Sequence, residues 1–177
     1  GPPGSGTELN TRQLLEANGL AYRDLAQWLM IPLAEAVDAF KGGELDGFFV
    51  TGGVPSPAIA EVAGAEMISL LPIDGIAAAK ATRRFRLLTP ARVPAGSYDG
   101  IRSDVPTLAV RSMLVARLDL EEDLVYRLTR SLMERRDELA QARPEARELS
   151  DQQAVQALTV PLHPGAEKYY REIGVVK

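Results

Sequence analysis

The sequence predicts an α/β layer fold, because segments that read as helices alternate with short apolar runs that read as strands. Two such runs, residues 45–50 and 67–73, are each followed by a helical pattern, which is the order of a parallel βαβ arrangement. The 177 residues are enough for one substantial core or two small ones. Hydrophobic residues make up 46% of the chain and charged residues 25%, as in an ordinary globular protein.

The first half of the chain contains four predicted helices, two of which have clear start signals. Ser5 and Glu8 have the S-x-x-E spacing of a capping box, and Gly19 is placed to end the helix that they begin. Ser56 can cap the third helix, and Pro57 can occupy its first position. The second, third and fourth helices are expected over residues 33–43, 58–65 and 75–85.

The second half changes character. Residues 89–106 carry three prolines and two glycines and read as an irregular connector, and residues 107–120 read as one long extended segment or two short strands. A helix is expected to begin near Asp119 and Glu122 and to end before Pro144. One face of this helix carries four leucines: Leu120, Leu124, Leu128 and Leu132. Two further helices are expected over residues 150–158 and 166–174.

The composition argues against several classes of function. The formal net charge of −4 and the pI near 5.1 give no electrostatic basis for a nucleic-acid partner. The basic cluster of Arg83, Arg84 and Arg86 around Phe85 reads as a solvated helix end. The chain has no cysteine and a single histidine, His163, so it can build neither a metal cluster nor a Cys–His pair. We therefore expect no enzyme, no cofactor and no metal site, and we interpret His163 as a structural hydrogen-bonding residue.

The opening stretch GPPGSGTELN is the first candidate site. Gly1 and Gly6 have the spacing of a P-loop, but Thr7 and Glu8 stand where its lysine and its magnesium-binding hydroxyl belong, which argues against nucleotide hydrolysis. The main-chain N–H groups and the hydroxyls of Ser5 and Thr7 at a helix start favour an anion, especially a carboxylate. The alternative is that the stretch is only a flexible leader.

The stretch TGGVPSP, residues 51–57, is the second candidate site. It follows a predicted strand and precedes a predicted helix, which is where open α/β sheets bind ligands. Gly52 and Gly53 expose main-chain N–H groups, while Pro55 and Pro57 stiffen the loop. The alternative is a plain turn between a strand and a helix.

Four stretches resemble, in this order, the C-terminal part of the TAXI-type receptors: GPPGSGTE, KGGELDGFFVTGGVPSPAI, VPAGSYDG and VPLHPGAEKYYREIG. These receptors are the extracytoplasmic solute-binding proteins of TRAP transporters, and the likeness extends from Gly1 to Gly174. It implies a periplasmic or extracytoplasmic protein that binds a small carboxylate, such as glutamate or a related amino or organic acid. Its other partners would be the membrane components of a TRAP transporter.

The resemblance also implies a domain organisation. Residues 1–106 would form a periplasmic-binding-protein-like lobe of type II with a mixed, mostly parallel sheet. Residues 107–177 would be the hinge crossing and the C-terminal helices that return to a first lobe. The ligand cleft would be lined from both candidate loops, by Ser5, Gly6, Thr7, Gly52, Gly53 and Pro55. Nothing in the sequence matches the family's N-terminal lobe, so we interpret the chain as a fragment of a longer receptor or as a natural single lobe, for which a homodimer is expected.

Two other functions stay open from the sequence. One is a metabolite-sensing effector domain of a transcriptional regulator or a sensor kinase, because such domains share this type of fold. The other is an enzyme that acts on small phosphorylated or pyrimidine compounds, although it would need histidine and acidic clusters that this chain lacks.

Overall fold

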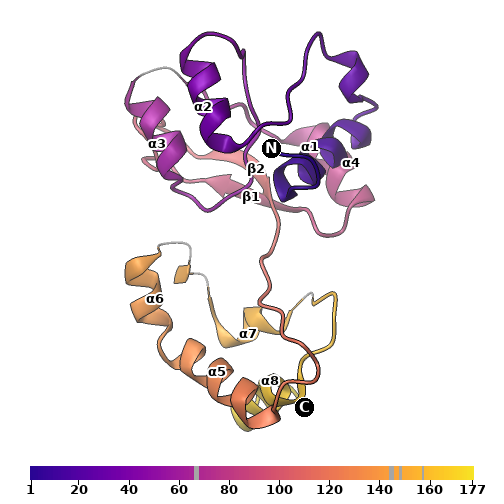
Figure 1. Ribbon diagram of the computed structural model, residues 1–177, viewed down its shortest axis with the longest axis vertical. Coiled ribbons are helices and arrows are strands. Elements are labelled where there is room, and N and C mark those ends of the chain that lie inside the picture. Colours follow the sequence, from indigo (N-terminus) through magenta and orange to yellow (C-terminus); the bar gives the residue numbers. More distant parts are fainter. Residues whose placement is uncertain (66–67, 144–145, 148, 157) are drawn as a thin grey trace. The chain divides into compact units, whose positions relative to one another are not determined.

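The computed structural model describes residues 1–65, 68–143, 146–147, 149–156 and 158–177. The chain divides into two compact units, Gly1–Arg111 and Ser112–Lys177. The first unit contains helices α1 to α4 and both strands, and the second contains α5 to α8 (Figure 1).

Helices form most of the regular structure of the first unit. Their bounds are α1 Gly6–Ala17, α2 Leu33–Lys41, α3 Pro57–Gly64 and α4 Gly75–Arg84, with a 3-10 turn at Tyr22–Asp24. All four predicted helices are thus confirmed. Gly19, just beyond α1, has a φ of 78°, a left-handed conformation that suits glycine at the end of a helix. α1 packs beside α4, and α2 packs beside α3 (Figure 1).

The prediction of an α/β fold with a mixed, mostly parallel sheet is wrong. The described chain is rich in helix, and its one sheet is an antiparallel pair, β1 Thr89–Val93 with β2 Val105–Ala109. The register runs from Thr89 opposite Ala109 to Val93 opposite Val105. This hairpin spans residues 89–109, so it occupies the region that the prolines marked as an irregular connector and also residues 107–109, the start of the segment that was expected to be extended. Pro90 and Pro106 fit there because both strands of a two-stranded ribbon are edges, so a proline can lie where no ladder N–H is needed.

The two apolar runs predicted as strands have another role. Residues 45–50 and the described part of the second run, 68–73, form no strand. They contribute Phe48, Ile68 and Leu70 to a core around α3. The buried centre of that core is made of Ile59, Ala63 and Tyr98. A short apolar run does not reveal by its periodicity whether it pairs in a sheet or covers a helix, and here it covers a helix. Met67 lies outside the described residues.

The second unit is built on a pair of packed helices. Its elements are α5 Glu122–Glu134, α6 Arg136–Ala142, α7 Asp151–Ala154 and α8 Pro164–Glu172. The helix expected to run from Asp119 to just before Pro144 is therefore two helices, which meet at Arg135. α5 packs against α8, and the buried side chains between them and α7 include Met133, Tyr169 and Tyr170.

His163 begins α8 as its N-cap. Its Nδ1 accepts a hydrogen bond from the main-chain N–H of Gly165 at 3.1 Å, and Pro164 occupies the first helical turn. The expected structural hydrogen bond is therefore present.

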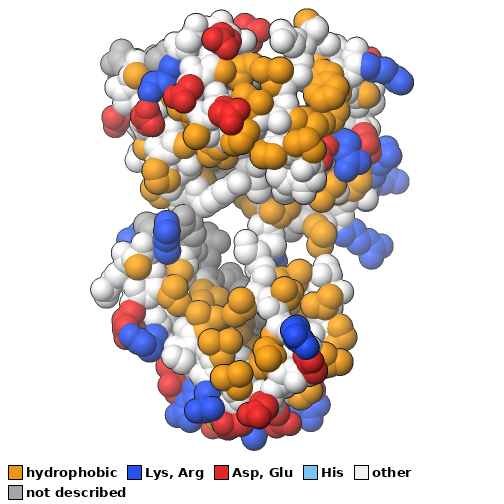
Figure 2. Space-filling view, in the orientation of Figure 1, with side chains coloured by type: hydrophobic (Ala, Val, Ile, Leu, Met, Phe, Trp, Pro, Cys, Tyr) orange, Lys and Arg blue, Asp and Glu red, His pale blue; other side chains and the backbone are white. Residues whose placement is uncertain are grey.

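The leucine face of α5 is turned to solvent instead of α8. Leu120, Leu124 and Leu128 are 40 to 51% exposed, whereas Val125, on another face of the same helix, is buried. Figure 2 shows hydrophobic side chains exposed on the visible face of both units.

Candidate functional site

The first turn of α1 forms one side of the candidate site. Ser5 is the N-cap, and its Oγ accepts a hydrogen bond from the main-chain N–H of Glu8 at 3.2 Å. The main-chain N–H groups of Gly6 and Thr7, the next two positions, have no partner among the described residues. The predicted capping box is only half present, because the N–H of Ser5 donates to the carbonyl of Pro2 rather than to Glu8.

The second candidate loop lies directly beside this turn. Thr7 Oγ1 accepts a hydrogen bond from the main-chain N–H of Thr51 at 3.1 Å. The side-chain amide of Asn10 donates to the hydroxyl of Thr51, also at 3.1 Å. Two segments that are 44 residues apart in the sequence are thereby joined by their polar groups.

The loop from Thr51 to Ser56 is held at both ends. Thr51 is bonded to Thr7, and the main-chain N–H of Ser56 donates to the hydroxyl of Tyr98 at 2.8 Å. The ring of Tyr98 is buried in the core around α3, so this end of the loop is tied to a packed part of the unit. Between the two anchors, Gly52 and Gly53 are exposed, and Pro55 follows a cis peptide bond.

The hydroxyls of Ser5 and Thr7 each keep a proton that they can donate. Each oxygen already accepts a main-chain N–H, from Glu8 and from Thr51 respectively. A hydroxyl that accepts one hydrogen bond still has its own proton to give. The candidate site therefore combines hydroxyl donors with main-chain N–H donors, and this combination suits an anion.

The carboxylate of Glu8 is turned away from this set of donors. It is almost fully buried, and its Oε1 accepts hydrogen bonds from Arg12 Nε at 3.1 Å and from the hydroxyl of Tyr22 at 3.2 Å. Burial, and then the charge of Glu8, raise the pKa of Tyr22 above its ordinary value. Arg12 offsets the charge of Glu8, so the negative charge next to the N-terminus of α1 is paired.

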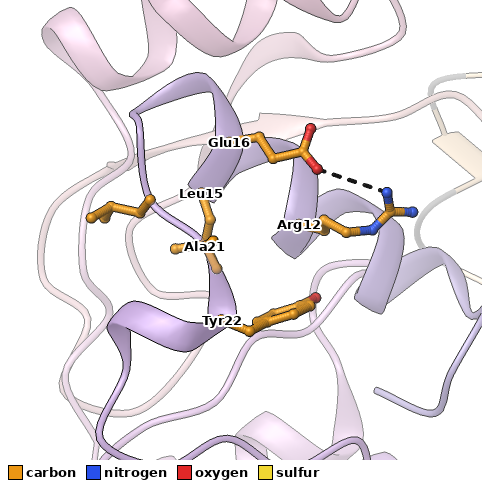
Figure 3. A pocket seen from close by; sticks show the side chains of 6 residues that line it. Arg12, Leu15, Glu16, Ala21 and Tyr22 are labelled. Carbon is orange, nitrogen blue, oxygen red and sulfur yellow. Dashed lines mark ion pairs between the residues drawn. The ribbon is translucent and has the colours of Figure 1, made fainter.

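A small pocket lies on this side of α1 (Figure 3). Arg12, Leu15, Glu16, Ala21 and Tyr22 line it together with Leu20, and Arg12 also pairs with Glu16 at 3.8 Å. Its volume of about 80 Å³ is well below the roughly 300–1,000 Å³ of pockets that bind organic ligands. We therefore interpret it as a small packing defect between α1 and the 3-10 turn and not as the ligand site.

The chain was compared with known families. The model of the NMT1-like family matches residues 1–174. The chain belongs to the NMT1-like family. This family includes periplasmic solute-binding proteins. The match therefore supports a solute-binding function in general and points to an extracytoplasmic location. Among the described residues, no helix is both long and apolar enough to cross a membrane.

In this NMT1-like chain, all six predicted site residues lie in the two segments that the structure joins. Ser5, Gly6 and Thr7 begin α1, and the other three lie in the loop before α3. Sequence reasoning gave no role to Asn10 and Thr51, which join the two segments, or to Tyr98, which anchors the far end of the loop. Thr51 stands directly before the glycine pair, and its hydroxyl was a visible signal. Its pairing with Thr7 is a long-range contact that no local pattern contains.

Proposed function

We propose that this chain is a solute-binding receptor of the TAXI type, which binds a small carboxylate for a TRAP transporter. It acts by binding and not by catalysis, and its partners are the membrane components of that transporter. The observation that carries the proposal is the hydrogen bond from the N–H of Thr51 to Thr7 Oγ1, because it unites the two donor-rich segments in one place.

The carboxylate would bind at the N-terminus of α1. One oxygen would accept from the N–H groups of Gly6 and Thr7, where the helix dipole also favours a negative charge. The hydroxyls of Ser5 and Thr7 would donate to the same group. The exposed N–H groups of Gly52 and Gly53 would reach the rest of the ligand, such as a second carboxylate of glutamate.

The charges of the two segments favour a carboxylate over a phosphate. Residues 5–10 and 51–56 contain no lysine and no arginine, and the one acid among them, Glu8, is paired with Arg12. Phosphate sites commonly add an arginine or a lysine to the main-chain donors because the ligand carries more charge. Neutral donors alone match a group with a single charge.

Calorimetry with a panel of small carboxylates, glutamate included, tests the site. We expect Thr7→Val to weaken binding by at least tenfold, because it removes a donor to the anion and the acceptor that holds Thr51. Thr11→Val is the matched control, since the hydroxyl of Thr11 donates only to the carbonyl of Thr7 within the same helix. Unchanged affinity in Thr7→Val would remove Thr7 from the site.

The transport role needs a separate measurement. Uptake of the bound solute by vesicles that contain the TRAP membrane subunits should depend on added receptor. Ligand binding that supports no uptake would favour the metabolite-sensing effector domain instead.

A further inference from the structure

The segment between Asp74 and Asp99 has an unusual charge. It contains five cationic residues and no carboxylate, in a chain whose net charge is −4. Arg92, in β1, pairs with Asp104 at 3.4 Å. The other four lie close together in the sequence, at the end of α4 and in the turn that follows it: Lys80, Arg83, Arg84 and Arg86.

These four cations are exposed and weakly paired. Lys80, Arg83 and Arg86 have no ion pair among the residues that the structure describes. Arg84 approaches Glu16 only at 3.8 Å, and its side chain is 59% exposed. Ala81 of α4 is fully buried, so the helix is fixed on the unit at this residue, while Lys80, Arg83 and Arg84 remain exposed.

The turn after α4 adds an apolar side chain to this surface. The N–H of Leu88 donates to the carbonyl of Phe85 at 3.0 Å, which closes a turn with Arg86 and Leu87 at its two central positions. Leu88 is buried, but Leu87 is 59% exposed. The helix dipole accounts for Arg83 and Arg84 in the last turn of α4, but it gives no reason for Arg86 and Leu87.

We propose that Lys80, Arg83, Arg84, Arg86 and Leu87, here called the basic turn surface, dock on an anionic lipid bilayer. The four cations contact headgroup phosphates, and Leu87 enters the boundary between headgroups and acyl chains. An exposed leucine beside arginines fits a lipid interface because a fluid bilayer needs no preformed pocket to receive it. The positive charge that attracts anionic headgroups is confined to this surface, because the rest of the chain is acidic. This inference is independent of the carboxylate site.

Cosedimentation with vesicles tests the basic turn surface. We expect the full chain to bind vesicles of phosphatidylcholine mixed with phosphatidylglycerol, to bind pure phosphatidylcholine much less, and to lose binding as salt is added. Each neutralised arginine should weaken partitioning about fivefold, so Arg83→Gln with Arg86→Gln should weaken it by about twenty-five-fold. Leu87→Ser should weaken binding severalfold at every salt concentration, because it removes the apolar part.

A matched variant controls for net charge. Arg23→Gln with Arg102→Gln makes the same change in charge at two exposed arginines outside the basic turn surface, and it should leave partitioning close to that of the parent chain. Equal losses in both double variants, or equal binding to both kinds of vesicle, would overturn the proposal. Binding to polyglutamate without binding to vesicles would also overturn it and would assign the surface to an acidic protein partner.

Discussion

At the scale of single residues, Gly165 sets how closely α5 and α8 approach each other. A Cβ atom at this position would lie 2.2 Å from the carbonyl oxygen of Glu122 and 2.7 Å from the main-chain nitrogen of Tyr126. Both are main-chain atoms of α5, so they cannot move aside as a flexible side chain would. Any larger residue must push the two helices apart.

We therefore expect Gly165→Ala to destabilise the second unit by about 1–3 kcal/mol, the usual cost of overpacking. Hydrogen exchange followed by mass spectrometry should show faster exchange in α5 and α8 and unchanged exchange in α1. Gly47→Ala is the control, because a Cβ there meets nothing within 4 Å and the backbone conformation is ordinary. Unaltered exchange in α5 would mean that the helices tolerate the methyl group and that this close approach is not required.

At the residue scale, the site could be predicted only in part. Ser5 and Thr7 were identifiable because a hydroxyl and a glycine at a helix start have known chemistry. The pairing of Glu8 with Arg12 has the i,i+4 spacing of one helix face, but the hydrogen bond from Tyr22 to Glu8 depends on the position of the 3-10 turn, which lies 14 residues further along the chain. Local spacing carries no information about such a partner.

At the scale of elements, helices were more predictable than strands, because the segment expected to be extended, residues 107–120, contains only the end of β2 at residues 107–109. α1 to α4 begin and end at signals that act within a few residues, such as Pro57 at the start of α3 and Gly42 at the end of α2. A strand exists only if a second segment pairs with it. β1 pairs with β2 despite Pro90 and Pro106, whereas the described parts of the more apolar runs form no strand. The second run comes nearest to one, because the N–H of Ile73 donates a single hydrogen bond to the carbonyl of Pro106 in β2 at 2.9 Å.

The α5–α8 pair also has a characteristic response to alkali. Burial, and then the negative charge of Asp151, raise the pKa of Tyr169 and of Tyr170. A tyrosine whose pKa is raised by folding contributes stability that is fully present below its unfolded pKa of about 10 and is lost as pH rises through the folded value. The second unit should therefore lose stability above about pH 10, and not in acid, on account of these two groups.

Absorbance near 295 nm tests this expectation, because it reports tyrosinate formation. The folded chain should form tyrosinate at higher pH than the same chain in urea. In Tyr170→Phe, the loss of stability above about pH 10 should be smaller than in the parent chain, since one of the groups with a raised pKa is gone. Coincident titration curves for the folded and the unfolded chain would contradict the account.

At the scale of the whole molecule, the chain consists of two units with separate cores. One core surrounds α3 and includes Ile59 and Tyr98, while the other lies between α5 and α8 around Met133. The segment between the units, from residue 110 to residue 117, forms no helix or strand. Residues 111–120 are all exposed. Such a segment opens easily, because it is exposed and belongs to no helix or strand.

We expect brief digestion with trypsin to cut first after Arg111 or Arg117, ahead of the other cationic residues in the chain. A protease needs an extended stretch of several residues in its active site, and arginines within helices do not offer one. Mass spectrometry should then find two stable products that separate within this segment, each retaining its own core. Replacing both arginines by glutamine should delay the appearance of these products without changing the circular dichroism of the intact chain. First cuts at Arg83 or Arg84 would instead show that the end of α4 opens more readily than the segment between the units, and the two-unit description would then have to be revised.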